Sequence, residues 1–464
     1  MFEKLANIFR IPDLRRRVLF TLAMLAVYRL GSHIPTPGID TKALQQLVAQ
    51  SGGGFLGLLD MFNGGNIRRL SIFALGIMPY ITASIILQLL TVVYEPLAKL
   101  QKEGELGRKK ITQWTRYLTV VLSALQSLGI AASLERSSAG LVTNPGVGFV
   151  LMAMLTLTAG SVFIMWLGEQ ITERGIGNGM SLLIFAGIVA GLPRGVYDLW
   201  DKISTGAWGG NFTPIAVALL VIVMVLVVAF IVYVERSERR IRVEYAKRVV
   251  GRRVMGGQST HLPLRVNAGG VMPVIFASSV LTFPAMIGGA FFQNSRYFQD
   301  KISILNYGEP LYTVLYCVGI IFFAYFYVSI VFNPMDVADN IRKYGGFVPG
   351  IRPGRRTADY INDILTRITL VGALYLCFVS LIPQFMITGT HLNHLPRLLG
   401  GDFFATFPVW FTQGLRVNFY FGGTSLLIVV GVAMDFVQQI ESQLIMRHYE
   451  GFTPRSGRIK GRRW

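Results

Sequence analysis

Charged side chains are scarce in this chain. Asp, Glu, Lys and Arg make up 15% of its 464 residues, against about 25% in ordinary soluble domains. Hydrophobic residues account for 52% and aromatic residues for 12%. This balance excludes a typical soluble enzyme and predicts an integral membrane protein.

The sequence also has few residues suited to redox, metal or covalent chemistry. Its two cysteines, Cys317 and Cys377, lie in separate apolar runs without a CxxC partner, so neither a disulfide framework nor a thiolate metal site is indicated. His391 and His394 lack the neighbouring cysteines or carboxylates of a zinc site. The glycines of 175–179 precede an apolar run and lack the Lys-Ser/Thr of a phosphate loop. With no nucleophile elbow or zincin motif either, we predict no enzymatic activity, no cofactor and no bound metal.

Ionisable side chains are nearly absent from the long apolar windows, apart from Arg29, Arg367 and Asp435 near window ends. Ion-coupled carriers need buried charges to bind and release the coupling ion. The hypothesis of a secondary transporter with discontinuous helices is therefore weakened. It remains the alternative function to a channel. An intramembrane protease would need a Ser-His or Asp-Asp pair inside the windows, and the sequence offers none.

Ten apolar windows have the length, about 18 to 25 residues, that crosses a bilayer of about 30 Å. They are residues 18–36, 71–93, 114–133, 147–168, 180–197, 213–234, 269–290, 311–332, 367–388 and 417–438. The first follows three arginines but has no small-x-small cleavage site, so we expect an uncleaved span rather than a signal peptide.

Lys and Arg concentrate in alternate loops, and the net charge is +19. Residues 1–17, 94–113, 235–268, 333–365 and 439–464 hold five, five, nine, five and six of them, whereas 193–212 and 291–310 hold two each. The positive-inside rule places the basic segments, and with them both termini, in the cytoplasm. The spans divide evenly into residues 1–205 and 206–464, which predicts two five-span halves of opposite orientation.

The most informative segment is residues 55–93, an apolar stretch broken by Asn63-Gly64-Gly65-Asn66 and by Arg68-Arg69. Two arginines at the bilayer centre would cost about 5 to 7 kcal/mol. The break must therefore lie in water or in a protein-lined cavity. We interpret the segment as a half-inserted stretch followed by a full span, which implies a pathway through the membrane.

The span after the break carries Ile77, Ile81 and Ile85 at four-residue spacing, which places them on one helical stripe. A ring of such residues at a constriction can exclude water and ions by dewetting. Ile77 alone would equally suit an ordinary core position, so this interpretation needs matching residues on other spans.

Two cytoplasmic loops are unusually basic. Loop 235–268 is long for a segment that only orients spans, and in loop 333–365 the Pro and Gly residues of 347–356 predict a projecting turn that presents arginines. Both loops would suit acidic partners or ribosomal RNA.

Long motifs in the chain closely resemble the SecY family, the channel subunits of protein-conducting translocons. They are Ser71–Ile81, Trp166–Gly179, Phe347–Gly354 and Phe419–Ser425. The resemblance implies an all-α polytopic protein of the bacterial plasma membrane, with ten transmembrane helices in two pseudo-symmetric five-helix halves around a central pore, and a short plug helix. It implies a channel that moves unfolded secretory polypeptides across the membrane and releases transmembrane segments laterally.

The resemblance also implies functional residues. The pore ring falls on Ile77, Ile81, Met180, Ile184, Ile275 and Ile428, where Met180 departs from an all-isoleucine ring. The plug falls on about residues 55–69, including Phe55, Leu58, Leu59, Met61, Phe62, Asn63, Gly64 and Gly65. The lateral gate falls on the seam between the second and third spans on one side and the seventh and eighth on the other. It includes Thr82, Gln88 and Phe283, where Gln88 makes either a polar contact across the closed seam or a local bond to backbone.

The partners implied are the SecE and SecG subunits, the motor SecA, the ribosome through its RNA and protein, signal peptides and nascent chains, and membrane lipids. SecA and the ribosome are expected on the two basic loops. The residues concerned are Arg239, Arg240, Lys247, Arg248, Arg252, Arg253, Arg352, Arg355 and Arg356.

Overall fold

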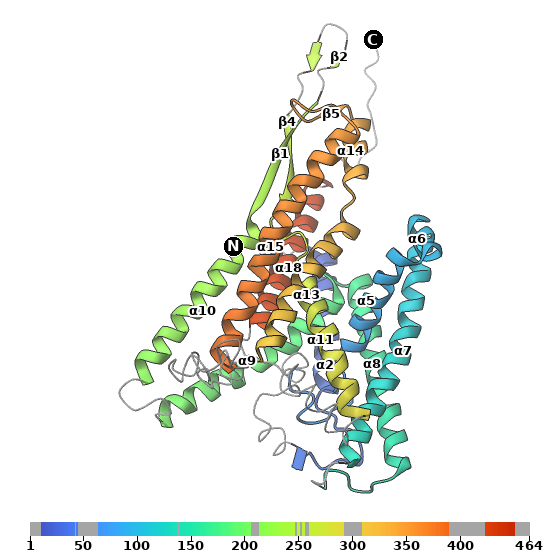
Figure 1. Ribbon diagram of the computed structural model, residues 1–464, viewed down its shortest axis with the longest axis vertical. Helices are drawn as coiled ribbons and strands as arrows, with labels where there is room; N and C mark the ends of the chain where they lie inside the picture. Colours follow the sequence, from blue (N-terminus) through green and yellow to red (C-terminus); the bar gives the residue numbers. More distant parts are fainter. Residues whose placement is uncertain are drawn as a thin grey trace, which may run out of the picture.

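The computed structural model describes most of the chain, and this part is predominantly helical (Figure 1). The described residues are 11–41, 43–44, 64–136, 140–205, 213–245, 248–250, 253–255, 259–291, 309–388 and 423–450. Several predicted positions lie outside them: the first plug residues, Phe55, Leu58, Leu59, Met61, Phe62 and Asn63, the loop residues Lys247 and Arg252, and His391 and His394.

Ten of the described helices coincide with the ten apolar windows. They are α2 (Pro12–Gly31), α5 (Met78–Val93), α7 (Glu105–Arg136), α8 (Val147–Arg174), α9 (Gly179–Thr205), α10 (Thr213–Arg236), α11 (Met272–Phe291), α13 (Pro310–Val331), α15 (Arg355–Thr388) and α18 (Gly423–Glu450). By length and hydropathy, six described helices could cross a membrane, or seven if the bent pair of α5 and α6 (Glu95–Lys102) is one span. The multi-pass helical class is confirmed, while the count of ten spans stays a prediction.

The second predicted span is wrong at its beginning. Ser71 forms an isolated β-bridge with Pro35, residues 72–77 form consecutive turns, and helix α5 begins only at Met78. Gly76 has a φ of 57°, which a right-handed helix cannot contain, and Pro79 favours the first turn of a new helix. The first span is shifted as well, because α2 covers Pro12–Gly31 rather than 18–36.

The basic loop 235–268 contains β-strands that the sequence interpretation missed. Strand β1 (Glu238–Tyr245) pairs antiparallel with β4 (Ser259–Arg265), and β2 (Arg248–Val250) pairs with β3 (Arg253–Met255) between them. Along β1, Ile241 and Val243 are buried while Arg240 and Arg242 are exposed. This two-residue alternation is typical of a half-buried strand, and the alternating apolar and charged residues of the sequence already indicate it.

The second basic loop joins the same sheet. Strand β5 (Gly346–Phe347) pairs with β1, so that Glu244 lies opposite Phe347. Ile241 and Leu264 pack with Val348 and Ile361 in a small core that both loops share. The hairpin and α14 (Pro334–Lys343) lie at the top of the molecule in Figure 1, and α6 lies lower, at the upper end of α5 and α7. The charge pattern assigns all three segments to the cytoplasmic side.

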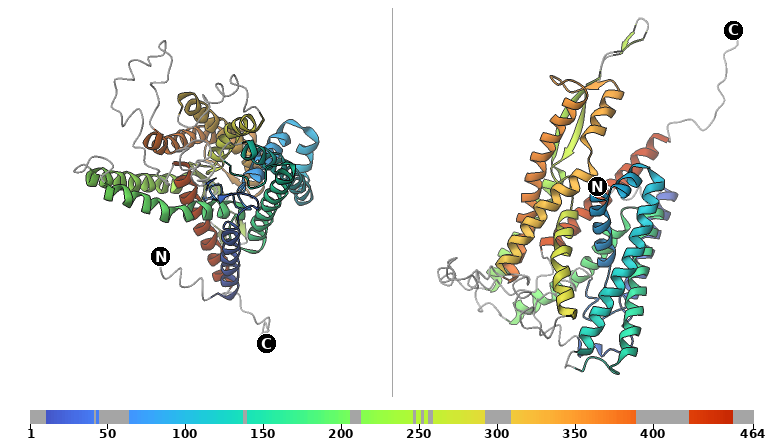
Figure 2. Two further views of the ribbon diagram at one scale, coloured as in Figure 1. Left: turned by 90° about the horizontal axis from the view of Figure 1, so that it is seen from below. Right: turned by 45° about the vertical axis from the view of Figure 1, so that its right-hand side comes forward.

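The largest core lies where helices from both halves of the chain meet. It includes Ile81, Ile184, Ile275 and Ile428 from four different helices. Helix α11 packs against α13 on one side and against α5 and α7 on the other, an arrangement visible in Figures 1 and 2. Gly179 illustrates how closely helices approach here, because a Cβ at this position would overlap the carbonyl oxygen of Gly168 on α8.

Candidate pore constriction

Five of the six predicted ring residues surround one small cavity. Its volume is 20 Å³, and its lining comprises Ile77, Met78, Ile81, Ile184, Ile275, Ser278 and Ile428. These residues come from the start of α5 and from α9, α11 and α18. The isoleucines are between 1% and 9% exposed. Helices that are distant in sequence therefore converge on a nearly closed aliphatic contact.

This cavity offers water almost no hydrogen bonds. A buried water needs about 10 to 15 Å³ and two to four polar partners, and the space is barely that large. Of the lining residues that the structure describes, Ser278 alone carries a side-chain hydroxyl, and this hydroxyl donates to the carbonyl oxygen of Ile275 at 2.9 Å. The constriction is therefore suited to exclude water rather than to bind a polar solute.

Met180, the sixth predicted ring residue, does not line that cavity. It is half-buried and packs against Gly168 of α8. It borders a separate cavity of 550 Å³, whose lining includes Tyr80, Arg116 and Glu169. Arg116 and Glu169 form an ion pair of 2.8 Å that joins α7 to α8.

The described end of the predicted plug lies next to the ring helices. Gly64 has a φ of 68° and approaches the backbone of Gly187 on α9, one helical turn beyond Ile184. Residues 64–70 form turns, and the rest of the predicted plug helix lies outside the described residues. Within this break Asn66 is buried, whereas Arg69 is exposed.

The predicted gate positions make local hydrogen bonds within α5. Gln88 donates to the Ser84 hydroxyl at 3.5 Å, and the Thr82 hydroxyl donates to the carbonyl oxygen of Met78 at 3.0 Å. Gln88 thus bonds within its own helix, although to a side chain rather than to the backbone. Phe283 belongs to α11, but its side chain lies outside the described part. At the predicted gate, α11 packs directly against α5 and α7.

The predicted docking arginines that the structure describes are exposed at one end of the molecule. Val348 to Ile351 form a turn in which the Ile351 N–H donates to the Val348 carbonyl at 3.1 Å. Pro349 occupies its second position and Gly350, with a φ of 81°, its third, as a type II turn requires. Val348 is buried and anchors the turn to the core, whereas Arg352, just after the turn, is exposed.

Four other arginines in this surface are exposed: Arg239 and Arg240 on β1, and Arg355 and Arg356 at the start of α15. In the β2–β3 pair Arg248 lies opposite Met255, and Arg253 lies opposite Val250. The side chains of both arginines lie outside the described part. The sheet therefore unites two loops that are about a hundred residues apart in the sequence into one surface.

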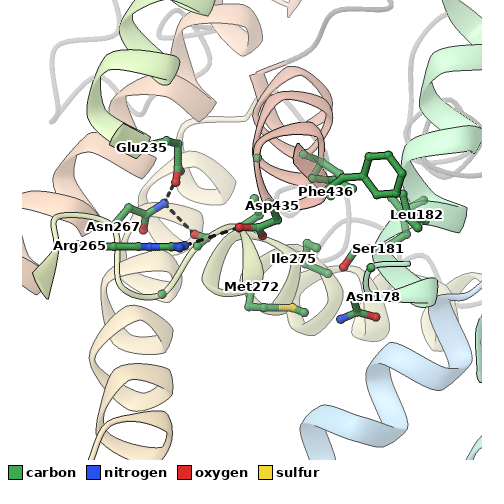
Figure 3. Close-up of a pocket in the computed structure, with 18 of the residues that line it drawn as sticks. Asn178, Ser181, Leu182, Glu235, Arg265, Asn267, Met272, Ile275, Asp435 and Phe436 are labelled. Carbon is green, nitrogen blue, oxygen red and sulfur yellow. Dashed lines mark hydrogen bonds and ion pairs between the residues drawn. The ribbon is translucent and has the colours of Figure 1, made fainter. Parts of the chain in front are cut away.

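A polar cavity of 360 Å³ adjoins the constriction (Figure 3). It shares Ile184, Ile275 and Ile428 with the aliphatic cavity. The rest of its lining carries charges and amides, among them Glu235, Arg265, Asn267, Asp435 and Gln439. We call this space the vestibule.

Comparison with known sequences decides the family. A sequence model of the SecY family matches residues 71–437, a range that contains all the constriction residues. The chain belongs to the SecY family.

Curated SecY proteins are similar over nearly the whole chain. The protein translocase subunit SecY of Escherichia coli strain K12 is 51% identical over 442 residues, covering 94% of this chain and 93% of that protein. Its counterpart in Haemophilus influenzae is 48% identical over 440 residues, with the same coverage.

Solved structures share the fold at low sequence identity. One, described as a protein conducting channel, has a TM-score of 0.63 and 16% identity, covering 95% of both chains. A second, described by the role of the SecY plug domain in stabilising the closed channel, has a TM-score of 0.61 with the same identity and coverage. The Sec61 of a canine ribosome–channel complex has a TM-score of 0.59. At this identity the likeness confirms the helical SecY-type fold.

The polar contacts of the vestibule are not predictable from the sequence motifs. Arg265 and Asn267 lie in a loop predicted only to be basic, and Asp435 lies near the end of a predicted span. Arg116 lies inside the predicted window 114–133 and received no role. Each is a charged or amide residue inside or beside a predicted span, and this position is the signal that the sequence offers.

Proposed function

We propose that this protein is the channel-forming subunit of a protein translocase. It moves unfolded secretory polypeptides across the membrane and releases hydrophobic segments sideways into the lipid. The observation that carries this proposal is the aliphatic cavity at which Ile77, Ile81, Ile184, Ile275 and Ile428 converge. Membership of a family whose curated relatives are named translocase subunits supports it.

The constriction seals the resting channel by excluding water. Hydrated ions cannot cross a dry aliphatic contact, whereas side chains from separate helices can move apart around a passing polypeptide. A small-solute carrier would instead need converging polar groups at this point. Among the residues that the structure describes, the lining contains one hydroxyl and no charged or amide side chain, so the channel is the better fit.

The two predicted halves, residues 1–205 and 206–464, form the two sides of this channel. The seam of α11 with α5 and α7 is the lateral gate, which Thr82, Gln88 and Phe283 line. Residues 55–69 are the plug, and the approach of Gly64 to α9 beside Ile184 supports a plug seated next to the ring. Met180 borders the neighbouring cavity and adjusts the fit between α8 and α9.

The channel itself catalyses no covalent reaction, and energy comes from partners that dock on the cytoplasmic sheet. SecA and the ribosome are the partners proposed for the exposed arginines, because guanidinium groups bind carboxylates and phosphates well. SecE and SecG are proposed as companion subunits. We place the protein in the bacterial plasma membrane because of its family, and both chain termini in the cytoplasm because the terminal segments are rich in Lys and Arg.

Site-specific crosslinking of a stalled secretory chain tests the proposal. Photoreactive residues at Ile77, Ile184 and Ile428 are expected to label the translocating chain. A probe at Val225, 62% exposed on α10, is the control and should label lipid instead. Labelling at Val225 without labelling at the three isoleucines would overturn the pore assignment.

A further inference from the structure

One arginine links the cytoplasmic hairpin to a helix of the constriction. Arg265 is the last residue of β4. Its Nη2 donates to Gln438 Oε1 at 2.6 Å, and its Nη1 lies 3.6 Å from Asp435 Oδ1 (Figure 3 shows the contact with Asp435). Both partners belong to α18, three residues apart, so that a single guanidinium spans about one helical turn.

Asn267, in the short connection between β4 and α11, bonds this region to a further helix, α10. Its Nδ2 donates to Glu235 Oε1 at the end of α10 at 2.7 Å, and to the carbonyl oxygen of Gly270 at 3.1 Å. Asn267 is 5% exposed. The short connection between β4 and α11 is therefore held in one conformation, and a displacement of β4 must move the start of α11.

These contacts lie directly behind the ring. Asp435 follows Ile428 on α18 by two helical turns, about 10 Å along the axis and on the same face. Ile275 lies one turn into α11, just after the connection that Asn267 fixes. Arg265, Asp435, Ile275 and Ile428 all line the vestibule.

We propose that Arg265 is a positioning residue for the seal: with Asp435 and Gln438 it forms a latch that holds α11 and α18, and hence Ile275 and Ile428, in contact in the resting channel. Because Arg265 is also the end of the docking hairpin, a partner that displaces β4 releases the latch. This inference rests on the proposed channel function.

The chemistry of the latch suits a contact that must open. The Arg265 side chain is 49% exposed and that of Asp435 66%, so water can replace either partner when the pair separates, and an exposed pair contributes little to stability. A buried pair would resist opening, because each charge would be left without solvation. The planar fork of arginine also reaches two acceptors at once, which a lysine ammonium cannot do in the same geometry.

The test is ion efflux from phospholipid vesicles that contain the full chain, with a potassium-sensitive dye as the readout. Arg265→Ala is expected to raise resting efflux about fivefold, the factor by which an exposed ion pair shifts a two-state equilibrium. Asp435→Asn keeps the shape and should give a smaller rise. The swapped pair Arg265→Asp with Asp435→Arg is expected to restore efflux toward the unmodified level, which a merely structural loss would not permit.

Lys99→Ala is the matched control, because Lys99 and Glu95 form an ion pair of the same 3.6 Å length on α6, away from the ring. Ile275→Asn is the positive control for the seal. Leakage by Ile275→Asn without leakage by Arg265→Ala or Asp435→Asn overturns the latch, as does a swapped pair that leaks as much as Arg265→Ala. Absence of leakage by Ile275→Asn itself contradicts the proposed function instead.

Discussion

The constriction and the vestibule share three isoleucines and yet are opposite environments. The constriction is a 20 Å³ space whose described lining residues carry a single hydroxyl, and the vestibule is a 360 Å³ space lined by two carboxylates, a guanidinium and several amides. One helical turn along α11 separates Ile275 from the polar connection between β4 and α11. The seal can be very thin, because a dry aliphatic contact excludes ions within a single layer of side chains.

The vestibule shows how that layer is held. Its side chains bond between elements, from β4 to α18 and from the β4–α11 connection to α10. Aliphatic contacts are non-directional and do not fix one arrangement of four helices, whereas hydrogen bonds have defined partners. Apolar residues thus supply the barrier, and the polar residues behind them set its geometry.

Polarity introduced into the constriction should have the largest effect. Ile428 is 1% exposed, so Ile428→Asn places an amide in a lining whose other described polar side chain is Ser278, and lets the cavity hydrate. We expect resting ion efflux from vesicles to rise about tenfold or more, as for loss of a hydrophobic gate. Ile428→Val keeps the aliphatic character and is the control. Equal efflux from both variants would contradict a dewetted seal.

Removal of polarity from the vestibule should act on stability instead. Asn267→Leu leaves the half-buried carboxylate of Glu235 without its amide donor. We expect the free energy of unfolding to fall by about 2 kcal/mol, the cost of an unsatisfied buried polar group. Thermal unfolding of the purified protein in detergent measures this loss of stability. Asn340→Leu, at an exposed position, is the control. An unchanged melting temperature for Asn267→Leu would show that the vestibule contacts are dispensable.

A polar residue at position 180 distinguishes the two cavities. Met180 borders the 550 Å³ cavity and not the constriction. Met180→Asn should therefore change resting efflux by less than about threefold, because the aliphatic side chains that line the constriction stay unchanged. If it leaks as strongly as Ile428→Asn, Met180 belongs to the ring, as the family resemblance implies.

The smallest effect is expected for Ser278→Ala. The Ser278 hydroxyl donates to the carbonyl oxygen of Ile275 in its own helix, so its removal leaves the α11 backbone bonded and the constriction slightly more apolar. We expect efflux within about twofold of the unmodified channel. A clear fall in efflux would mean that water at this hydroxyl already weakens the seal.

Much of the fold was predictable from local patterns. Ten apolar windows fall on ten helices, and the stripe Ile77, Ile81 and Ile85 is buried as its spacing indicates. Helix boundaries were less predictable: α5 begins late because Gly76 and Pro79 outweigh the hydropathy of residues 71–77. The β1–β4 hairpin was missed because charge dominated the interpretation of loop 235–268, although its alternating burial follows the sequence.

By itself, the sequence determined that the chain is a multi-pass membrane protein, which segments are basic and which positions are aliphatic, because hydropathy, charge and periodicity are local properties. Only the tertiary structure decided that Ile77, Ile81, Ile184, Ile275 and Ile428 meet while Met180 does not. It alone paired β5 with β1 and placed Arg265 against Asp435. These contacts join residues many positions apart, and their formation depends on how whole helices pack, which no local pattern encodes.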